Sequence, residues 1–153
     1  MTGRAVDLDR VRAFIGKEHG LVSVATTRQD GSIQASVVNA GVLDHPLTGA
    51  PVVGLVAQGG SAKLRHLRAR PFAAVTYRAG WEWLTVEGRA ELAGPDDALK
   101  GIDAERLRVL LREIFTAAGG THDDFDEYDR VMAAERRTAV LLTPTRTYGV
   151  GGT

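Results

Sequence analysis

One stretch of the sequence, residues 83–92, reads Trp-Leu-Thr-Val-Glu-Gly-Arg-Ala-Glu-Leu. Apolar or small residues alternate with polar ones, which is typical of a β-strand with one buried and one wet face. We predict a buried face of Leu84, Val86, Gly88, Ala90 and Leu92. The opposite, wet face then holds Trp83, Thr85, Glu87, Arg89 and Glu91. The extended pattern of residues 72–77 predicts a second strand directly before it.

Four more stretches read as strands, at residues 21–27, 33–38, 52–56 and 138–143, the last followed by Pro144 and a short extended tail through Tyr148. Asp30-Gly31 is a hairpin turn signal between the first two. Because the strands are mostly consecutive rather than alternating with helices, the sequence predicts a closed antiparallel barrel and excludes a parallel sheet. The fold class is mainly β, with flanking helices.

Helical spacing of apolar residues and helix-ending signals predict four helices, over residues 7–19, 61–70, 103–118 and 121–136. Gly20, Pro71 and Gly119-Gly120 follow the first three as stops. The fourth opens on Thr121-x-x-Asp124, which is close to a capping box.

Composition limits the classes of function. The 153 residues suit a single domain, 1–153, and 19 Lys plus Arg balance 19 Asp plus Glu. A zero net charge argues against a nucleic-acid-binding module. The chain has no cysteine, and no apolar run in the sequence is long enough to span a membrane, so we expect a cytoplasmic protein.

The sequence also lacks several catalytic signatures. Its four histidines, at positions 19, 45, 66 and 122, have no metal-ligand spacing, so no metal site is expected. A G-x-S-x-G elbow is missing, which excludes acyl transfer of that kind. The acidic run of residues 122–129 matches what a helix start favours and is interpreted as structural.

One segment favours an anion site. Gly59-Gly60 precede a helix that opens with Ser61 and carries Lys63 in its first turn. Unpaired N–H groups, a hydroxyl and an ammonium would all face the same place. Lysine in a first helical turn costs about 0.3–1 kcal/mol against the helix dipole, which favours a bound negative group as compensation.

Other residues of interest each have two interpretations. Arg68 and Arg70 are expected to complement the helix C-terminus, and His66 either shares the anion site or is structural. Trp81 and Trp83, on one face of a strand entry, are either core residues or a wall for a planar ligand. Gly88 marks a bulge or a close backbone approach. The three tyrosines, Tyr77, Tyr128 and Tyr148, are interpreted as structural.

Taken in order and spacing, these segments resemble a known family: the flavin and deazaflavin split-barrel proteins related to pyridoxamine 5'-phosphate oxidase, and within them the actinobacterial branch that uses coenzyme F420. The resemblance covers nearly the whole chain. It is carried by the opening helix and hairpin, Ala62–Pro71, Gly80-Trp81, Val86–Ala90, Asp124–Tyr128 and Tyr148-Gly149.

The resemblance implies a six-stranded split β-barrel that forms an obligate homodimer with two cofactor grooves between protomers. It places the cofactor phosphate at Lys63, with Ser61, Ala62, Arg65 and His66 beside it. The ring system would lie along Ser36, Val37, Val38 and Asn39, near Val56 and Ala57, with Trp81 of either chain close by. Two positions depart from the family pattern, since Ser61 replaces a basic residue and His66 a frequent asparagine.

The function implied by this resemblance is an F420-dependent oxidoreductase that transfers hydride from the reduced deazaflavin to an unsaturated organic acceptor. A redox cofactor supplies its own reactive atoms, so the protein needs no nucleophile or metal, and no catalytic residue is assigned. Arg65, Arg68 and Arg70 could follow the coenzyme's acidic tail. The alternatives are an FMN-dependent oxidase or reductase of the same barrel, and a non-catalytic carrier or sensor of the deazaflavin or of haem.

Overall fold

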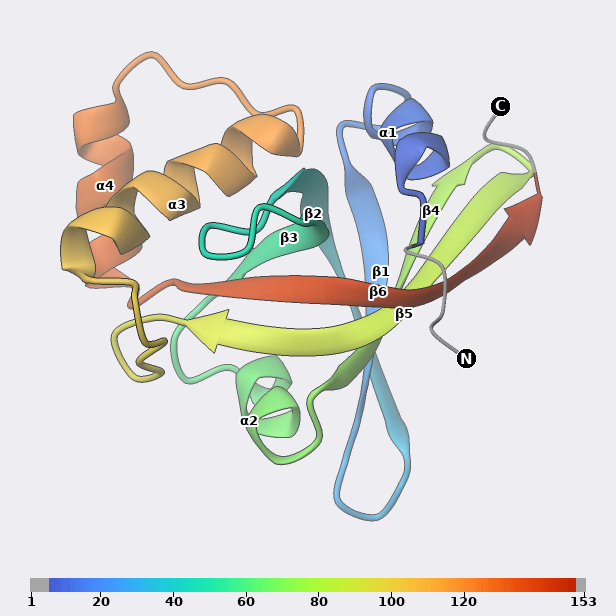
Figure 1. The fold of residues 1–153 in the computed structure, drawn as a ribbon, viewed down its shortest axis with the longest axis horizontal. Coiled ribbons are helices and arrows are strands. Elements are labelled where there is room, and N and C mark those ends of the chain that lie inside the picture. The colour runs from blue at the N-terminus through green and yellow to red at the C-terminus, as the bar shows by residue number, and fades with distance from the viewer. Residues whose placement is uncertain (1–5, 151–153) are drawn as a thin grey trace.

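The computed structural model describes residues 6–150 and contains six strands and four helices (Figure 1). Along the chain they are α1 (Asp9–Ile15), β1 (Leu21–Thr27), β2 (Ile33–Asp44), β3 (Pro51–Ala57), α2 (Ala62–Ala69), β4 (Phe72–Ala79), β5 (Glu82–Ala93), α3 (Ala104–Ala117), α4 (Phe125–Ala134) and β6 (Thr138–Val150). The strands close into one antiparallel barrel in the order β1-β2-β3-β6-β5-β4. The predicted barrel with flanking helices is therefore confirmed.

The alternation in β5 predicts its faces with two departures, at Thr85 and at Leu92, which is only partly buried. Leu84, Val86 and Ala90 are buried as expected. Thr85, which was predicted on the wet face, is only 5% exposed. Its hydroxyl lies 2.7 Å from the hydroxyl of Thr76 on β4, so the two polar groups satisfy each other and the threonine can be buried.

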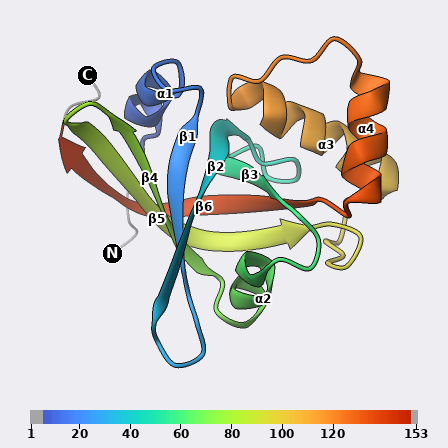
Figure 2. The ribbon, with the colours of Figure 1, turned by 180° about the vertical axis from the view of Figure 1, so that it is seen from behind.

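The wall of the barrel is incomplete between β2 and β3. These strands pair only from Ala40 to Asp44, opposite Leu55 to Pro51. Further along, residues 33–39 of β2 pair with β1 alone, and Val56 and Ala57 of β3 pair with β6 alone. The β1–β2 hairpin therefore projects out of the barrel (Figure 2), and one edge of β2 has no partner strand among the described residues.

The last strand is longer than predicted. The sequence suggested a strand ending at Thr143 with a separate tail, but β6 runs from Thr138 to Val150. Gly88 pairs with Pro144 and Glu87 with Arg146, so Thr145 is the extra residue of a β-bulge. The bulge accommodates a proline that cannot donate a ladder hydrogen bond, and it confirms the interpretation of Gly88.

Two helices differ from prediction at their ends. The first was predicted over residues 7–19 but spans Asp9–Ile15, and the chain then turns through His19 and Gly20, both with positive φ. The fourth begins at Phe125, because the Asp124 side chain, not that of Thr121, accepts the first helical N–H groups. The third helix is capped by Asp103 as its predicted boundary requires.

Two apolar clusters stabilise this arrangement. Inside the barrel, Phe14 and Val11 of α1 pack with strand residues such as Val75 and Val86. Outside it, Ile114 of α3 and other residues of α3 and α4 pack against β3 and β6. In Figure 1 the α3–α4 pair and α1 both lie above β6, the pair on the left and α1 toward the right, whereas α2 lies below β5.

The close backbone approach at the bulge should make even a small substitution of Gly88 strongly destabilising. A Cβ at position 88 would lie 2.3 Å from the carbonyl oxygen of Thr143, which is backbone and cannot move aside. We expect Gly88→Ala to lower the free energy of unfolding by about 2–3 kcal/mol in a urea titration. Gly16→Ala is the control, because nothing lies within 4 Å of a Cβ there, and its effect should stay below about 0.5 kcal/mol. Equal unfolding midpoints for the two variants would contradict this account.

Candidate functional site

The free edge of β2 is the first component of the site. Ser36, Val37, Val38 and Asn39 all lie on the part of β2 that pairs with β1 alone. Their outward-facing backbone N–H and C=O groups are available to a ligand, because no strand occupies the gap toward Val56. A flat molecule with hydrogen-bonding edges can take the place of the missing strand.

The start of α2 supplies an unsatisfied hydroxyl. Ser61 is the N-cap residue, but its side chain makes no capping hydrogen bond. The hydroxyl oxygen is buried and has no hydrogen-bond partner in the structure. A buried polar group without a partner costs free energy unless a ligand satisfies it, so Ser61 points to a bound group at this place.

Lys63, in the first turn of α2, is also a polar group without a compensating partner among the described residues. It makes no ion pair with any carboxylate in residues 6–150, and its side chain is half-buried. Burial, and then the neighbouring positive charge of Arg137, lower the pKa of the Lys63 ammonium. An anion beside Lys63 would reverse both effects.

Arg137 is a site residue that the sequence analysis missed. Arg137 directly precedes the first residue of β6. It lies close enough to Lys63 to lower the pKa of that lysine, and its own guanidinium is paired with Glu135 at 3.0 Å. The N–H of Gly59 donates to the carbonyl of Glu135 at 3.1 Å, which fixes the two segments together. No local pattern signals this neighbour, because it depends on the pairing of β3 with β6.

A cavity of about 500 Å³ extends from Arg137 between the barrel and the α3–α4 pair. Three predicted ring-site residues line it: Val38, Asn39 and Val56. The Asn39 amide donates to the carbonyl of His19 at 2.8 Å, which holds this side chain at the rim. The structure thus brings the middle of β2, the end of β3 and Arg137 together along one groove, and Lys63 lies near its Arg137 end without lining it.

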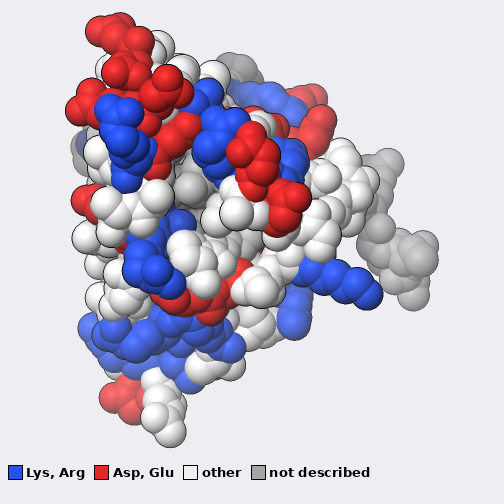
Figure 3. Space-filling model, turned by 90° about the vertical axis from the view of Figure 1, so that its left-hand side faces the viewer, with Lys and Arg blue, Asp and Glu red and all other residues white. Residues whose placement is uncertain are grey.

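A second group of cations surrounds His66. Its Nδ1 lies 2.9 Å from the hydroxyl of Thr26, and burial followed by the charges of Arg28, Arg70 and Arg65 lowers its pKa. Arg65 and Arg70 donate to the backbone carbonyls of Gly60 and Thr27, not to carboxylates. Lys and Arg side chains accordingly gather over the lower part of the face in Figure 3, at the height of α2 in Figure 1.

Arg68 does not belong to this group of cations, because it is paired with a carboxylate. Both ends of its guanidinium bind the Asp97 carboxylate at 2.7 Å. The expectation that Arg68 follows a ligand's acidic tail is therefore not supported by its contacts. Its position late in α2 fits the alternative of a structural arginine.

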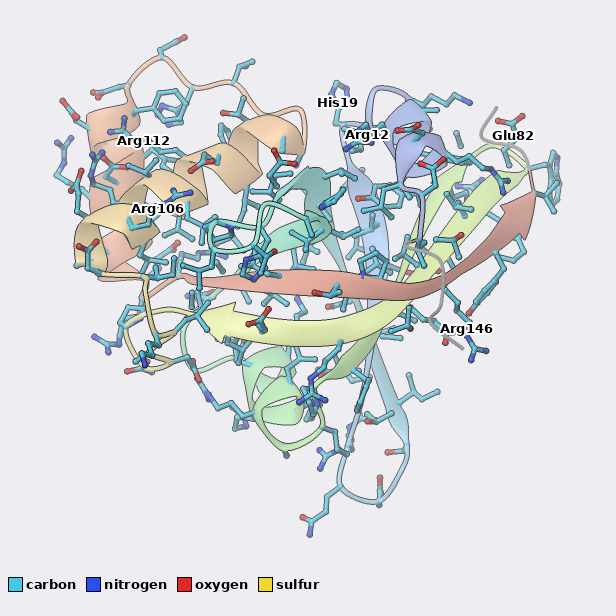
Figure 4. All side chains as sticks on the ribbon, viewed as in Figure 1. Arg12, His19, Glu82, Arg106, Arg112 and Arg146 are labelled. Carbon is cyan, nitrogen blue, oxygen red and sulfur yellow. The ribbon has the colours of Figure 1, made fainter. Side chains whose placement is uncertain are left out.

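Other predicted residues contribute differently or lie elsewhere. Ala62 opens α2, and Ala57 is buried, so Ala57 can present only backbone. Val37 is 70% exposed on β2. Trp81 lies in the β4–β5 turn and not on the strand, and it is 97% exposed. Its neighbour Glu82 marks the end of the barrel remote from α2 (Figure 4), so Trp81 does not reach the groove of its own chain.

The tyrosines and histidines do not form a catalytic centre. Tyr77 donates to the Ala40 carbonyl, Tyr128 to that of Leu111, and Tyr148 to the Glu87 carboxylate. Burial raises the pKa of Tyr77, and it raises that of Tyr128 to about 12. Within residues 6–150 no cluster of His, Asp and Glu could hold a metal ion, and no helix is long and apolar enough to cross a membrane.

Comparison with known proteins gives consistent relatives. A model of the pyridoxamine 5'-phosphate oxidase family matches residues 8–151. Among solved structures, a conserved hypothetical protein from Mycobacterium tuberculosis is similar with a TM-score of 0.67 and 19% identity, over 99% of this chain and 91% of that chain. An F420 reductase is similar with a TM-score of 0.59 and 15% identity, over 86% of this chain and 91% of that chain.

A third similar structure is a pyridoxamine 5'-phosphate oxidase-related, FMN-binding protein from Nostoc punctiforme. Its TM-score is 0.63 and its identity 14%, over 92% of this chain and 78% of that chain. At these identities the structural likenesses show the shared fold, and the family model covers almost the whole chain. The chain therefore belongs to the pyridoxamine 5'-phosphate oxidase family, whose split barrel is a flavin-binding fold.

Proposed function

We propose that this protein is an F420-dependent oxidoreductase that reduces an unsaturated organic acceptor. One observation carries the proposal: the free edge of β2 and Arg137 line the same groove, and Lys63, which has no carboxylate partner among the described residues, lies near Arg137. Together they suit a flat ring system joined to a negatively charged group.

Each part of the groove has a role toward such a ligand. The Ser61 hydroxyl and the Lys63 ammonium would donate to phosphate oxygens, which satisfies the orphaned hydroxyl and stabilises the charged lysine. The backbone of residues 36–39 would hold the edge of the ring system. Val38 and Val56 would keep water from the ring face.

The cations beyond Lys63 favour the deazaflavin over FMN. Coenzyme F420 carries a phosphodiester and an oligoglutamate tail, whereas FMN ends in one phosphate. The guanidinium groups of Arg65 and Arg70 donate to backbone carbonyls and not to carboxylates, so they can attract a tail of carboxylates. FMN would leave them unused.

When bound, reduced F420 would supply a hydride to the acceptor's double bond and itself become oxidised, and solvent would supply the proton that completes the addition. The chain's own contribution is to bind, orient and exclude water. The described tyrosine hydroxyls are all engaged in hydrogen bonds, so none is offered as a proton donor.

We further propose that two copies associate so that each groove is completed by its partner. Large apolar side chains are exposed on β2 and on β4, which is separated from β2 by β1, among them Ile33, Val37 and Phe72. Exposed apolar patches of this kind are typical of interfaces. The same association would give Trp81, which cannot reach its own groove, a position near the partner's.

Titration with the two cofactors tests the proposed function. We expect oxidised F420 to bind at least about tenfold more tightly than FMN, with a steeper loss of affinity at high salt because its tail is a polyanion. Fluorescence of F420 and calorimetry with FMN measure this. A yellow protein purified from a host without F420 would favour the FMN-dependent alternative. Binding without oxidation of reduced F420 by enones, quinones or tetrapyrroles would favour a carrier.

Replacing Lys63 should weaken F420 binding while it stabilises the unliganded protein. A charged hydrogen bond contributes about 1.5–3 kcal/mol, so Lys63→Ala should raise the Kd for F420 by about 10- to 100-fold. In the unliganded protein the same change removes a desolvated charge beside Arg137, and Tm should rise by about 1–3 °C. Lys100→Ala, which removes an exposed lysine, is the control for both measurements. An unchanged Kd would refute the assignment of Lys63.

The pH dependence of stability should follow from the same lysine. Since the folded-state pKa of Lys63 lies below its unfolded value of 10.5, the unfolded state binds more protons between the two values. The unliganded protein should therefore gain stability relative to Lys63→Ala as pH rises through that window. Saturation with F420 should abolish the difference in slope. Chemical unfolding at a series of alkaline pH values measures it.

The proposed association is tested by mass and by Trp81. Light scattering should give twice the chain mass of 16.4 kDa. Because Trp81 is almost fully exposed, Trp81→Ala should leave the monomer fold intact while weakening F420 binding through the partner's groove. A monomeric mass, or an unchanged F420 affinity in this variant, would count against the proposed arrangement.

A further inference from the structure

The large cavity extends well beyond the proposed cofactor residues, into the α3–α4 pair. Its barrel side is formed by Val38, Asn39 and Val56, whereas its far side is formed by Phe115, Met132 and the loop that includes Thr121. At about 500 Å³ it is within the range of about 300–1,000 Å³ that holds small molecules. A phosphate-anchored ring on the β2 edge accounts only for the barrel side.

The far wall is held in place independently of any ligand. The ring of Phe115 packs against Tyr128 at 5.0 Å and against Phe125 at 6.4 Å. A Cβ at Gly120 would lie 2.6 Å from the Phe115 ring, so only glycine allows the loop to close against it. Gly119, with φ of 92°, makes the turn that brings the loop there. The cavity is thus preformed.

The chemistry of the lining selects the ligand. The lining contains no Asp or Glu, and its ionisable side chains are His19, Tyr128 and Arg137. Because the Tyr128 hydroxyl is engaged with the Leu111 carbonyl, the aromatic wall presents mainly apolar surface. Arg137, which is paired with Glu135 outside the lining, is a hydrogen-bond donor at one end of the cavity and therefore suits a neutral or anionic acceptor group better than a cation.

We infer that this cavity binds the second reactant, and that the α3–α4 pair selects it as a flat, apolar molecule that is uncharged or anionic. The inference rests on the proposed function for the identity of the first reactant. Met132 and Thr121 are then specificity-determining residues. They lie on the side opposite the β2 edge, so they can be changed without altering the groups assigned to the cofactor.

A binding experiment on the cofactor-free protein tests the cavity directly. The probe is 8-anilinonaphthalene-1-sulfonate, which is aromatic and apolar with an anionic end, and menadione serves as a flat, uncharged competitor. We expect fluorescence enhancement at one site, with displacement by menadione. Met132→Trp and Thr121→Trp, which fill the cavity from α4 and from the loop before it, should each weaken the binding of both ligands by about tenfold or more.

Val131→Trp is the matched control, because Val131 adjoins Met132 on α4 but is 42% exposed and does not line the cavity. It should leave both affinities unchanged. Thr121 lies in an exposed loop, so its replacement keeps the test valid if Met132→Trp lowers Tm. Probe binding that survives both filling variants would overturn the inference.

The cofactor titration separates this inference from the proposed function. F420 affinity should change by less than about twofold in Met132→Trp. If F420 and menadione are weakened equally, the cavity belongs to the cofactor and the inference is wrong. The wild type could bind neither F420 nor FMN and still bind the probe and menadione as expected. The proposed function would then be wrong, and the cavity would remain a binding site for flat apolar ligands.

Discussion

The short pairing between β2 and β3 is the constraint on which the rest of the structure depends. Pairing stops at Ala40 and Leu55, and each strand then follows a different neighbour. A barrel paired along its full length would bury the backbone of residues 33–39 in a ladder and leave no place for a ligand. Because it opens here, residues of β2 and of the α3–α4 pair line one cavity, and the start of α2 lies near its Arg137 end.

The groove combines features that are unfavourable in the free protein. A buried hydroxyl without a partner at Ser61 and a half-buried ammonium at Lys63 each lower stability until something negative binds. The barrel core, from Phe14 on α1 to Val86 on β5, is large and apolar enough to tolerate that cost. Stability and ligand affinity are therefore opposed at Ser61 and Lys63, as is common for preorganised sites.

The features that could be predicted from the sequence are those that depend on a local pattern of residues. Alternation in β5 predicted its buried residues, and glycine followed by Ser61 and Lys63 predicted an anion site that the orphaned hydroxyl now supports. Arg137 could not be predicted, because its approach to Lys63 requires β3 and β6 to be paired. The start of α4 was missed because Thr121 and Asp124 are both residues that cap helices well. Thr85 was misassigned since its burial requires the hydroxyl of Thr76 across the sheet.

The unpaired margin of β2 has a consequence for how the molecule survives in a cell. Residues 33–39 contain no charge and no proline, the two devices that usually prevent open sheet margins from recruiting further strands. An open margin of this kind can pair with the same segment of another chain and so promote aggregation. Under the proposed function, a cofactor bound along residues 36–39 would cover this margin, and the yield of folded protein would then depend on cofactor supply.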